Sequence, residues 1–162
     1  MEETGLIDRI YAAFSAAPRP SPDEITPHRC PECDEVGDRL ARYESSAVSV
    51  PDMEWLGDSL PLLSPKALRY FLPRYLEFSI THRGSNACEF VLYHLAAEHP
   101  EQDYWTERYR VFSRSERNAI VEYLRYRATW ADAEFEEDWV KRAIGFWSAQ
   151  QGQAGDAQNA RG

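Results

Sequence analysis

Hydrophobic residues recur every three or four positions in several segments of this chain, which is the periodicity of amphipathic helices. In residues 4–16, Leu6, Ile10 and Phe14 fall on one stripe and predict the first helix. Three prolines within residues 18–22 follow it. Because proline lacks a backbone N–H and clashes with the preceding helical turn, this stretch ends the helix and predicts an extended connector.

Two further segments of the N-terminal half show helix signals of different strength. Residues 31–43 begin with proline, which suits the first helical position, and predict a second, weaker helix. Residues 52–58 predict a single turn. Ser64 and Pro65 are a good helix start, and the apolar pattern that follows predicts the third helix. Pro73 lies inside that pattern and predicts a kink, because it removes one backbone hydrogen bond.

The C-terminal half predicts three more helices and one uncertain segment. The fourth helix begins near Asn86, and residues 113–116 (Ser-Arg-Ser-Glu) match a capping box that begins the fifth. Residues 104–112 alternate partly and predict a short strand or an extended link. The sixth helix is predicted over residues 132–149, where large or apolar residues recur every four positions: Phe135, Trp139, Ala143 and Trp147.

These elements predict an all-α fold, an irregular bundle of about five to six helices with proline-rich loops. Residues 1–149 form a single helical domain in this interpretation. Residues 150–162 are polar without a pattern and predict a disordered tail. No apolar run is long enough for a membrane span and no secretory signal is visible, so a cytoplasmic location is expected, with no membrane association.

The composition narrows the classes of partner. Hydrophobic residues make up 43% of the 162 positions, enough for a core, and the formal net charge is −9. This charge argues against nucleic acid, whose binding requires basic side chains. It is compatible with a basic protein partner, although many proteins are acidic for solubility alone. Residues 1–60 hold 13 acidic and 5 basic side chains and carry most of the excess.

One short segment concentrates the side chains that could carry chemistry. Residues 28–33 contain His28, Cys30 and Cys33, which are two of the three cysteines and one of the four histidines. A C-x-x-C turn lets two thiolates share one zinc ion, and a histidine two positions earlier can reach the same side. Zinc requires a fourth ligand, which would come from His82, His94, His99, Asp34 or water.

Two other interpretations of this segment stay open. If Pro31 opens a helix, Cys30 lies at its positive end, which favours a reactive thiolate and a redox pair. Acidic neighbours oppose that effect, and the βαβ scaffold of thioredoxin-like enzymes is missing. Alternatively, the cysteines pack as small apolar residues and His28 bonds a backbone carbonyl.

A second candidate site lies on the last predicted helix. Trp139 and Trp147 share this helix with acidic residues in its first turn, Glu134, Glu136 and Glu137. Tryptophan is common at interfaces, so these five side chains are a candidate surface for a basic partner. The same pattern also fits a helix that docks on the bundle.

Three residues outside these clusters carry simpler expectations. Cys88 falls on the apolar face of the fourth helix and is expected in the core. His94 is expected at the surface or at a helix cap. Arg108 belongs to a group of four arginines interleaved with glutamates, which predicts a solvated face with salt bridges.

The first functional hypothesis is therefore a non-enzymatic, acidic interaction module that masks a basic partner, as inhibitor or immunity proteins do. The second is a zinc-binding or thiol-redox protein that uses His28, Cys30 and Cys33. No nucleophile elbow, phosphate-binding glycine loop or paired-carboxylate motif is present, so no catalytic residue is predicted.

Two segments also resemble a known family. They are residues 28–35 (HRCPECDE) and residues 60–76 (LPLLSPKALRYFLPRYL), in that order and with Trp55 between them. Together they resemble a bacterial family of small proteins of unknown function, DUF6714, over about residues 5–128. The resemblance implies a small cytoplasmic bacterial protein and supplies no activity. It leaves the last helix and the tail as additions to the family pattern.

Overall fold

The computed structural model describes residues 2–96, 102–130 and 136–153. These residues form eight α-helices, three short 3-10 turns and no β-strand. The helices are α1 Glu3–Ala13, α2 Pro31–Leu40, α3 Val50–Trp55, α4 Pro65–Thr81, α5 Asn86–Leu95, α6 Asp103–Arg110, α7 Arg114–Arg127 and α8 Glu137–Gln153. The 3-10 turns are η1 Pro22–Glu24, η2 Ser45–Ala47 and η3 Leu60–Leu62.

The all-α class is confirmed, and the expected five to six helices is an undercount. One added helix is α3, predicted as a single turn. The other is α6, which replaces the strand or link predicted over residues 104–112. Trp105, Arg108 and Tyr109 turn inward at helical spacing in α6. Arginine is the only charged residue of the three, and its burial hid the helical pattern.

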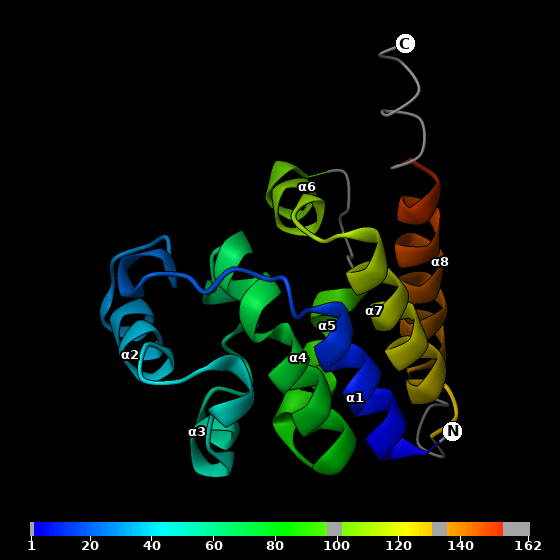
Figure 1. Ribbon diagram of the computed structural model, residues 1–162, viewed down its shortest axis with the longest axis horizontal. Coiled ribbons are helices and arrows are strands. Elements are labelled where there is room, and N and C mark those ends of the chain that lie inside the picture. The colour runs from blue at the N-terminus through cyan, green and yellow to red at the C-terminus, as the bar shows by residue number, and fades with distance from the viewer. Residues whose placement is uncertain (1, 97–101, 131–135, 154–162) are drawn as a thin grey trace.

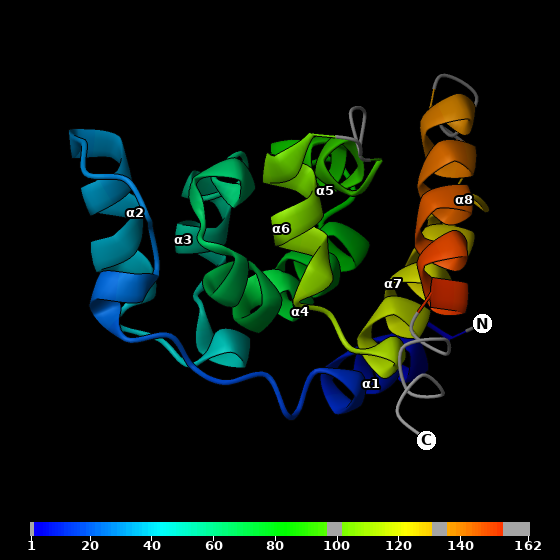
Figure 2. The same cartoon turned by 90° about the horizontal axis from the view of Figure 1, so that it is seen from above.

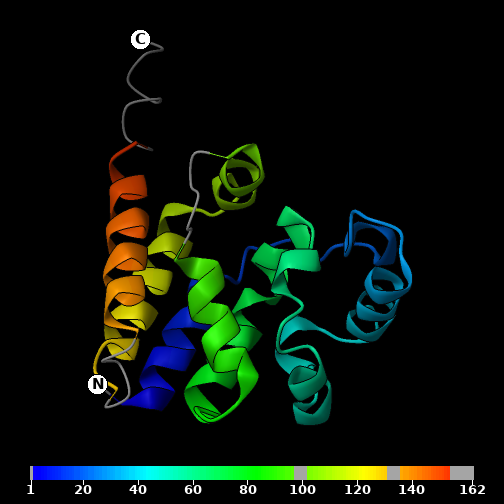
Figure 3. The ribbon, with the colours of Figure 1, turned by 180° about the vertical axis from the view of Figure 1, so that it is seen from behind.

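The helices are arranged along the long axis of the molecule with α2 and α8 at its opposite ends (Figure 1). Helix α7 packs against both α1 and α8, and α4 packs against α1, α3, α5 and α6. The view from above and the view from behind show the same order (Figures 2 and 3). Helix α4 is therefore the central element that joins the two ends.

Large side chains fill the core around α4. Phe71, Tyr75 and Phe78 on α4, Tyr123 on α7 and Trp147 on α8 are all fully buried. The two buried tyrosine hydroxyls are satisfied, since Tyr75 shares a 2.6 Å hydrogen bond with Ser59 and Tyr123 shares a 2.8 Å bond with Ser79. Burial of these rings thus leaves neither hydroxyl without a partner.

The two strongest start signals in the sequence are confirmed. The Ser64 Oγ accepts a 3.1 Å hydrogen bond from the Ala67 N–H at the start of α4. At α7 the Glu116 N–H donates to the Ser113 Oγ at 3.2 Å, and the Ser113 N–H donates to the Glu116 carboxylate at 2.7 Å. Helix α4 continues through Pro73, so this proline does not end it.

The bounds of the last helix differ from the prediction. Helix α8 begins at Glu137, and the predicted start at residues 132–135 lies outside the described residues. It continues through Gln153, so residues 150–153 are helical rather than part of a tail. Residues 154–162 lie outside the described ranges. Within those ranges no helix combines the length and apolar composition that a membrane span requires.

The N-terminus of α2 is held in place by the connector before it. Thr26 donates a 3.3 Å hydrogen bond from its hydroxyl to the Cys33 carbonyl. The Ser64 N–H donates to the Ile25 carbonyl at 2.8 Å, and Lys66 pairs with Glu24 at 2.7 Å. These contacts tie the residues before α2 to the start of α4, which fixes the position of the cysteine segment.

Candidate metal and thiol site

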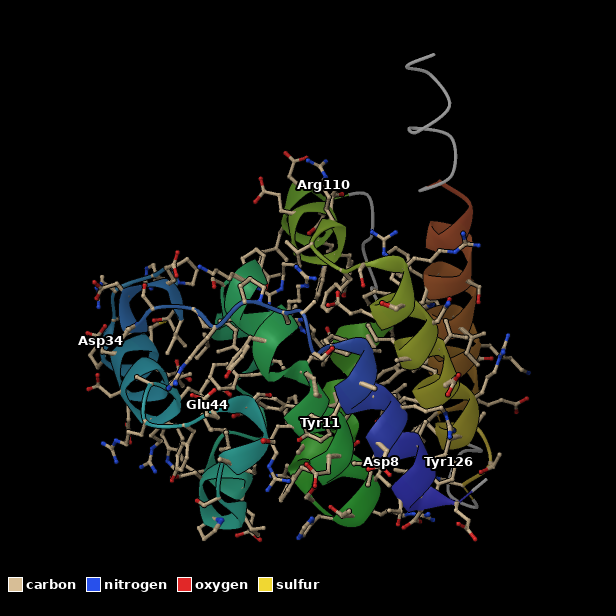
Figure 4. All side chains as sticks on the ribbon, viewed as in Figure 1. Asp8, Tyr11, Asp34, Glu44, Arg110 and Tyr126 are labelled. Carbon is tan, nitrogen blue, oxygen red and sulfur yellow. The ribbon has the colours of Figure 1, made fainter. Side chains whose placement is uncertain are left out.

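The structure brings His28, Cys30 and Cys33 together at the N-terminus of α2. The imidazole nitrogen and the two sulfurs lie within 4.8 Å of one another. Asp34, the residue after Cys33, marks the outer edge of the molecule in Figure 4. The predicted cluster is therefore one group of side chains at the end of the long axis opposite α8.

Local backbone geometry explains this convergence. Cys30 is the N-cap of α2, with extended backbone angles of φ −158° and ψ 162°, and Pro31 occupies the first helical position. The Cys33 N–H donates to the Cys30 Sγ at 3.3 Å. Cysteine here does the work that serine or aspartate does at most helix starts. The Nδ1 of His28 lies 3.8 Å from the Cys33 Sγ.

The three side chains differ in their access to solvent. His28 is exposed, Cys30 is half-buried, and Cys33 is buried at 2% exposure. Cys33 shares the inner face of α2 with Val36 and Leu40, which are also buried. One side of the group therefore meets solvent, and the other side rests on the core.

The environment separates the two thiols in acidity. The pKa of Cys30 is lowered, first by the hydrogen bond from the Cys33 thiol, then by the Cys33 N–H and by His28. The pKa of Cys33 is raised to about 11 by the hydrogen bond between its thiol and Cys30 and by burial. Cys30 is therefore the first of the pair to ionise.

The group fits three of the four positions of a zinc ion. A tetrahedral zinc, with bonds of about 2.3 Å to sulfur and about 2.1 Å to nitrogen, holds its ligand atoms roughly 3.5–3.8 Å apart. The distance from His28 to Cys33 is already 3.8 Å. The other separations between ligand atoms do not exceed 4.8 Å. Side-chain rotations that move an atom by about 1 Å therefore bring all three atoms to zinc-binding distances.

The structure does not add any of the predicted fourth ligands. His82 stacks on Phe78 at the end of α4, and His94 is buried beside Arg108. His99 lies outside the described residues. Asp34 faces Arg29 at 3.5 Å and is not part of the group of ligand atoms, which holds three residues among those described. Among the predicted candidates that the described residues can test, none joins the group, which leaves water as the proposed fourth ligand.

The candidate partner surface on α8 is only partly assembled. Trp139 is 41% exposed, and its ring centroid lies 5.5 Å from that of Tyr93, which is 43% exposed. Glu137 is exposed and pairs with Lys141, whereas Glu136 pairs with the buried Arg127. Glu134 lies outside the described residues.

Trp147 does not belong to such a surface. It has no exposed area, and its indole N–H donates to the Leu95 carbonyl at 2.9 Å. Its ring meets those of Tyr109 and Phe112 edge-on at 4.8 and 5.5 Å. Burial in the core makes Trp147 inaccessible to a partner. This side chain instead docks the last helix onto the other helices.

A buried polar pair went unrecognised in the sequence. His94 and Arg108 are 1% and 2% exposed, which contradicts the expected surface positions of both. The His94 Nε2 lies 3.4 Å from an Arg108 nitrogen, and Arg108 donates to the carbonyls of Leu60 and Leu63. Burial, then the charge of Arg108, lowers the pKa of His94 well below its usual value. The three-residue spacing between Trp105 and Arg108, which places both on one face of a helix, is the sequence signal that indicates burial of Arg108.

The third cysteine is confirmed as a core residue. Cys88 is 2% exposed, and its thiol donates to the Ser79 carbonyl at 3.2 Å. Burial raises its pKa to about 11. Cys88 is therefore chemically separate from the pair on α2.

Comparison with known proteins places the chain in a family. A family of unknown function, DUF6714, matches residues 4–151. This range reaches beyond the expected end at residue 128 and includes most of α8, so the last helix is part of the family pattern rather than an addition. No curated protein and no solved structure matches the chain. Because the family model covers residues 4–151, the chain belongs to the DUF6714 family.

Proposed function

We propose that this protein binds a thiophilic divalent metal, zinc, through His28, Cys30 and Cys33. The observation that carries the proposal is the convergence of one imidazole nitrogen and two sulfurs within 4.8 Å at the start of α2. Nitrogen and sulfur together are the donor set that zinc prefers. Two thiolates and a neutral imidazole balance the charge of the ion, and water takes the fourth position.

The metal is an accessory ion in this proposal and does not hold the fold together. All three ligands come from six consecutive residues, so the ion links no distant elements. Helix α2 is already capped by Cys30, and its inner face is buried without a metal. Structural zinc sites, by contrast, join segments that have little core of their own.

The environment of the site agrees with a cation. Glu32 lies between the two cysteines, Asp34 and Glu35 follow them, and Arg29 faces Asp23 and Asp34 at 3.5 Å each. Free thiols persist in a reducing compartment. We therefore place the protein in the bacterial cytoplasm, as the family resemblance implies.

Metal content and thiol state, measured together by native mass spectrometry, test the proposal. Protein purified without chelator is expected to carry one zinc per chain. Cys30→Ser removes a ligand but keeps a good helix cap, so it should lose the metal without losing the fold. Cys88→Ser is the matched control, because its hydroxyl can still donate to the Ser79 carbonyl. Equal zinc content in all three proteins, or none in the wild type, would contradict the proposal.

A second candidate function is binding of a basic protein through the outer face of α5 and α8. The observation that favours it is the pair of half-exposed rings, Tyr93 and Trp139, next to the acidic first turn of α8 in a chain of net charge −9. Such a module would mask its partner as inhibitor or immunity proteins do.

Partner capture tests this second candidate. Trp139→Ala and the charge reversal Glu137→Lys are expected to reduce recovery of a basic partner. Trp55→Ala is a control, since Trp55 is also 41% exposed but lies on α3. Failure to recover any basic protein, or equal loss in the control, would count against it. Helices α2 and α8 lie at opposite ends of the molecule (Figure 2), so each candidate site can be altered alone.

A further inference from the structure

We infer that the metal site is redox-regulated: a small disulfide, such as oxidised glutathione, converts Cys30 and Cys33 to a disulfide and thereby releases the metal. The inference rests on the proposed metal site. It concerns how that site is emptied, and it follows from the position and unequal exposure of the two cysteines.

The two sulfurs are placed for bond formation. Cys30 is the N-cap and Cys33 the third residue of α2, and their sulfurs lie within 4.8 Å. Residues three apart in a helix have Cα atoms about 5 Å apart, which falls inside the range of roughly 4.4–6.8 Å found in disulfides. Rotation of the two side chains therefore closes the bond without movement of the helix.

Unequal exposure gives each cysteine a distinct role. Cys30 is half-buried and meets solvent, so an incoming disulfide reaches its sulfur. Cys33 is 2% exposed and is shielded from the same reagent, but it lies next to Cys30. Cys88 is also 2% exposed and bonds to the Ser79 carbonyl, so it takes no part. Cys30 reacts first and Cys33 resolves the product.

The reaction balances in two exchange steps. The Cys30 thiolate attacks one sulfur of the small disulfide, forms a mixed disulfide and expels one small thiolate. The Cys33 thiolate then attacks the Cys30 sulfur and expels the second small thiolate. Two protein thiolates lose two electrons in total, and the small disulfide gains them. The metal is left with His28 alone, because disulfide sulfurs are poor ligands compared with thiolates.

The experiment treats zinc-loaded protein with oxidised glutathione and follows free zinc with a chromogenic indicator and protein mass by mass spectrometry. Loss of the bound zinc is expected, together with a mass lower by about 2 Da for the loss of two thiol hydrogens. Dithiothreitol should restore both the thiols and zinc uptake. Cys88→Ser should behave as the wild type does, and Cys30→Ser should form no intramolecular disulfide.

Three outcomes would overturn the inference, and they separate it from the proposed function. Zinc that a chelator removes but oxidised glutathione leaves in place overturns the redox inference and keeps the metal site. A stable glutathione adduct on Cys30 without a Cys30–Cys33 disulfide does the same. Wild-type protein that takes up no zinc overturns both.

Discussion

His94 is a buried base next to a buried cation. Arg108 of α6 faces its imidazole, the Tyr109 hydroxyl donates to the His94 carbonyl at 2.5 Å, and the Trp105 ring packs against the imidazole with 5.2 Å between centroids. In the described part of the chain no carboxylate pairs with Arg108, which instead donates to carbonyls around η3. A second positive charge at His94 is therefore costly.

This arrangement predicts a loss of stability on the acid side. In the unfolded chain His94 binds a proton near its ordinary pKa of 6.5, whereas the folded pKa lies well below it. The contribution of His94 to stability is therefore fully present above its unfolded pKa of 6.5. It falls as the pH drops from there toward the folded pKa, by up to about 1.4 kcal/mol per pH unit. His94→Gln should reduce the pH dependence of the free energy of unfolding, measured by urea denaturation from pH 7 to pH 5. His82→Gln controls for removal of a histidine elsewhere, and an unchanged slope in His94→Gln would refute the assignment.

A second residue-scale prediction concerns the cap of α2. Cys30→Ala removes the sulfur that accepts the Cys33 N–H, and a lost cap costs about 1 kcal/mol of unfolding free energy. Cys30→Ser should cost little, because serine is a better cap than cysteine. Urea denaturation in reductant and chelator measures both without a contribution from metal. Equal destabilisation in the two variants would show that the cap is not what holds this end of α2.

At this scale the sequence predicted which residues gather on α2 but not how their surroundings differ. The C-x-x-C spacing and the proline are local signals, and they were enough to join His28, Cys30 and Cys33. The burial of Cys33 depends on packing against the connector, which no local pattern records. Likewise, Arg108 turns inward because the carbonyls of η3 receive it, and those come from a segment far away in the chain.

Among the elements, α7 has the most strongly fixed start. Glu116 closes the capping box with Ser113 and is buried. Its carboxylate also pairs with Arg69 of α4 at 2.9 Å, with 1% of the glutamate side chain and 23% of the arginine side chain exposed. One carboxylate therefore both caps α7 and ties it to the central helix.

Removal of this carboxylate should be costly. Glu116→Ala leaves Arg69 half-buried without its partner and opens the cap, so a loss of about 3–5 kcal/mol is expected. Glu122→Ala on the same helix is the matched control. Its pair with Arg9 is much more exposed, and its loss should cost about 0–1 kcal/mol. The urea midpoints of the two variants measure this difference, and similar midpoints would contradict the role given to Glu116.

Caps explain why some elements were predictable and others were not. Ser64 and Ser113 are the N-caps of α4 and α7, and the predicted first residues of both helices were correct. Helix α6 has no side-chain cap and buries an arginine, so neither its start nor its inner face stands out. Helix α3 has six residues, which is too short for a periodic pattern to register.

At the scale of the whole molecule, α8 packs along α7 and buries Val140, Ala143 and Trp147 in the core. Trp147 fills the space against Tyr109 and Phe112 and bonds to the Leu95 carbonyl. Helix α8 thereby contacts α5 as well as α7. The end of the chain is part of the core, in agreement with the family match over residues 4–151.

Trp147→Ala is expected to lower the free energy of unfolding by about 3–5 kcal/mol, because it leaves a large cavity and an unpaired carbonyl. Trp139→Ala changes a tryptophan on the same helix that is 41% exposed, and should cost roughly 0.5 kcal/mol or less. Thermal and urea unfolding compare the two. A small effect of Trp147→Ala would show that α8 adds little to the domain.

The arrangement of the helices was the part that no sequence pattern could supply. Amphipathic stripes show that each helix has a partner, but not which one. The pairing of α1 with α7 includes polar contacts such as Arg9 with Glu122 and Tyr126 with Glu3. Figure 4 shows Tyr126 beside α1. Arg9 and Glu3 are exposed and Glu122 and Tyr126 are partly buried, and such polar pairs leave no periodic pattern in either segment.

The same pairing has a consequence for the order in which the newly made protein folds. Arg9 and Glu122 are 113 positions apart in the chain, and Glu3 and Tyr126 are 123 apart. Helix α1 packs on α4 and α7, and the ribosome makes α1 long before it makes α7. Contacts this distant in sequence form slowly, since a long loop must close before they do. Helix α1 therefore cannot reach its final packing until α7 has been synthesised.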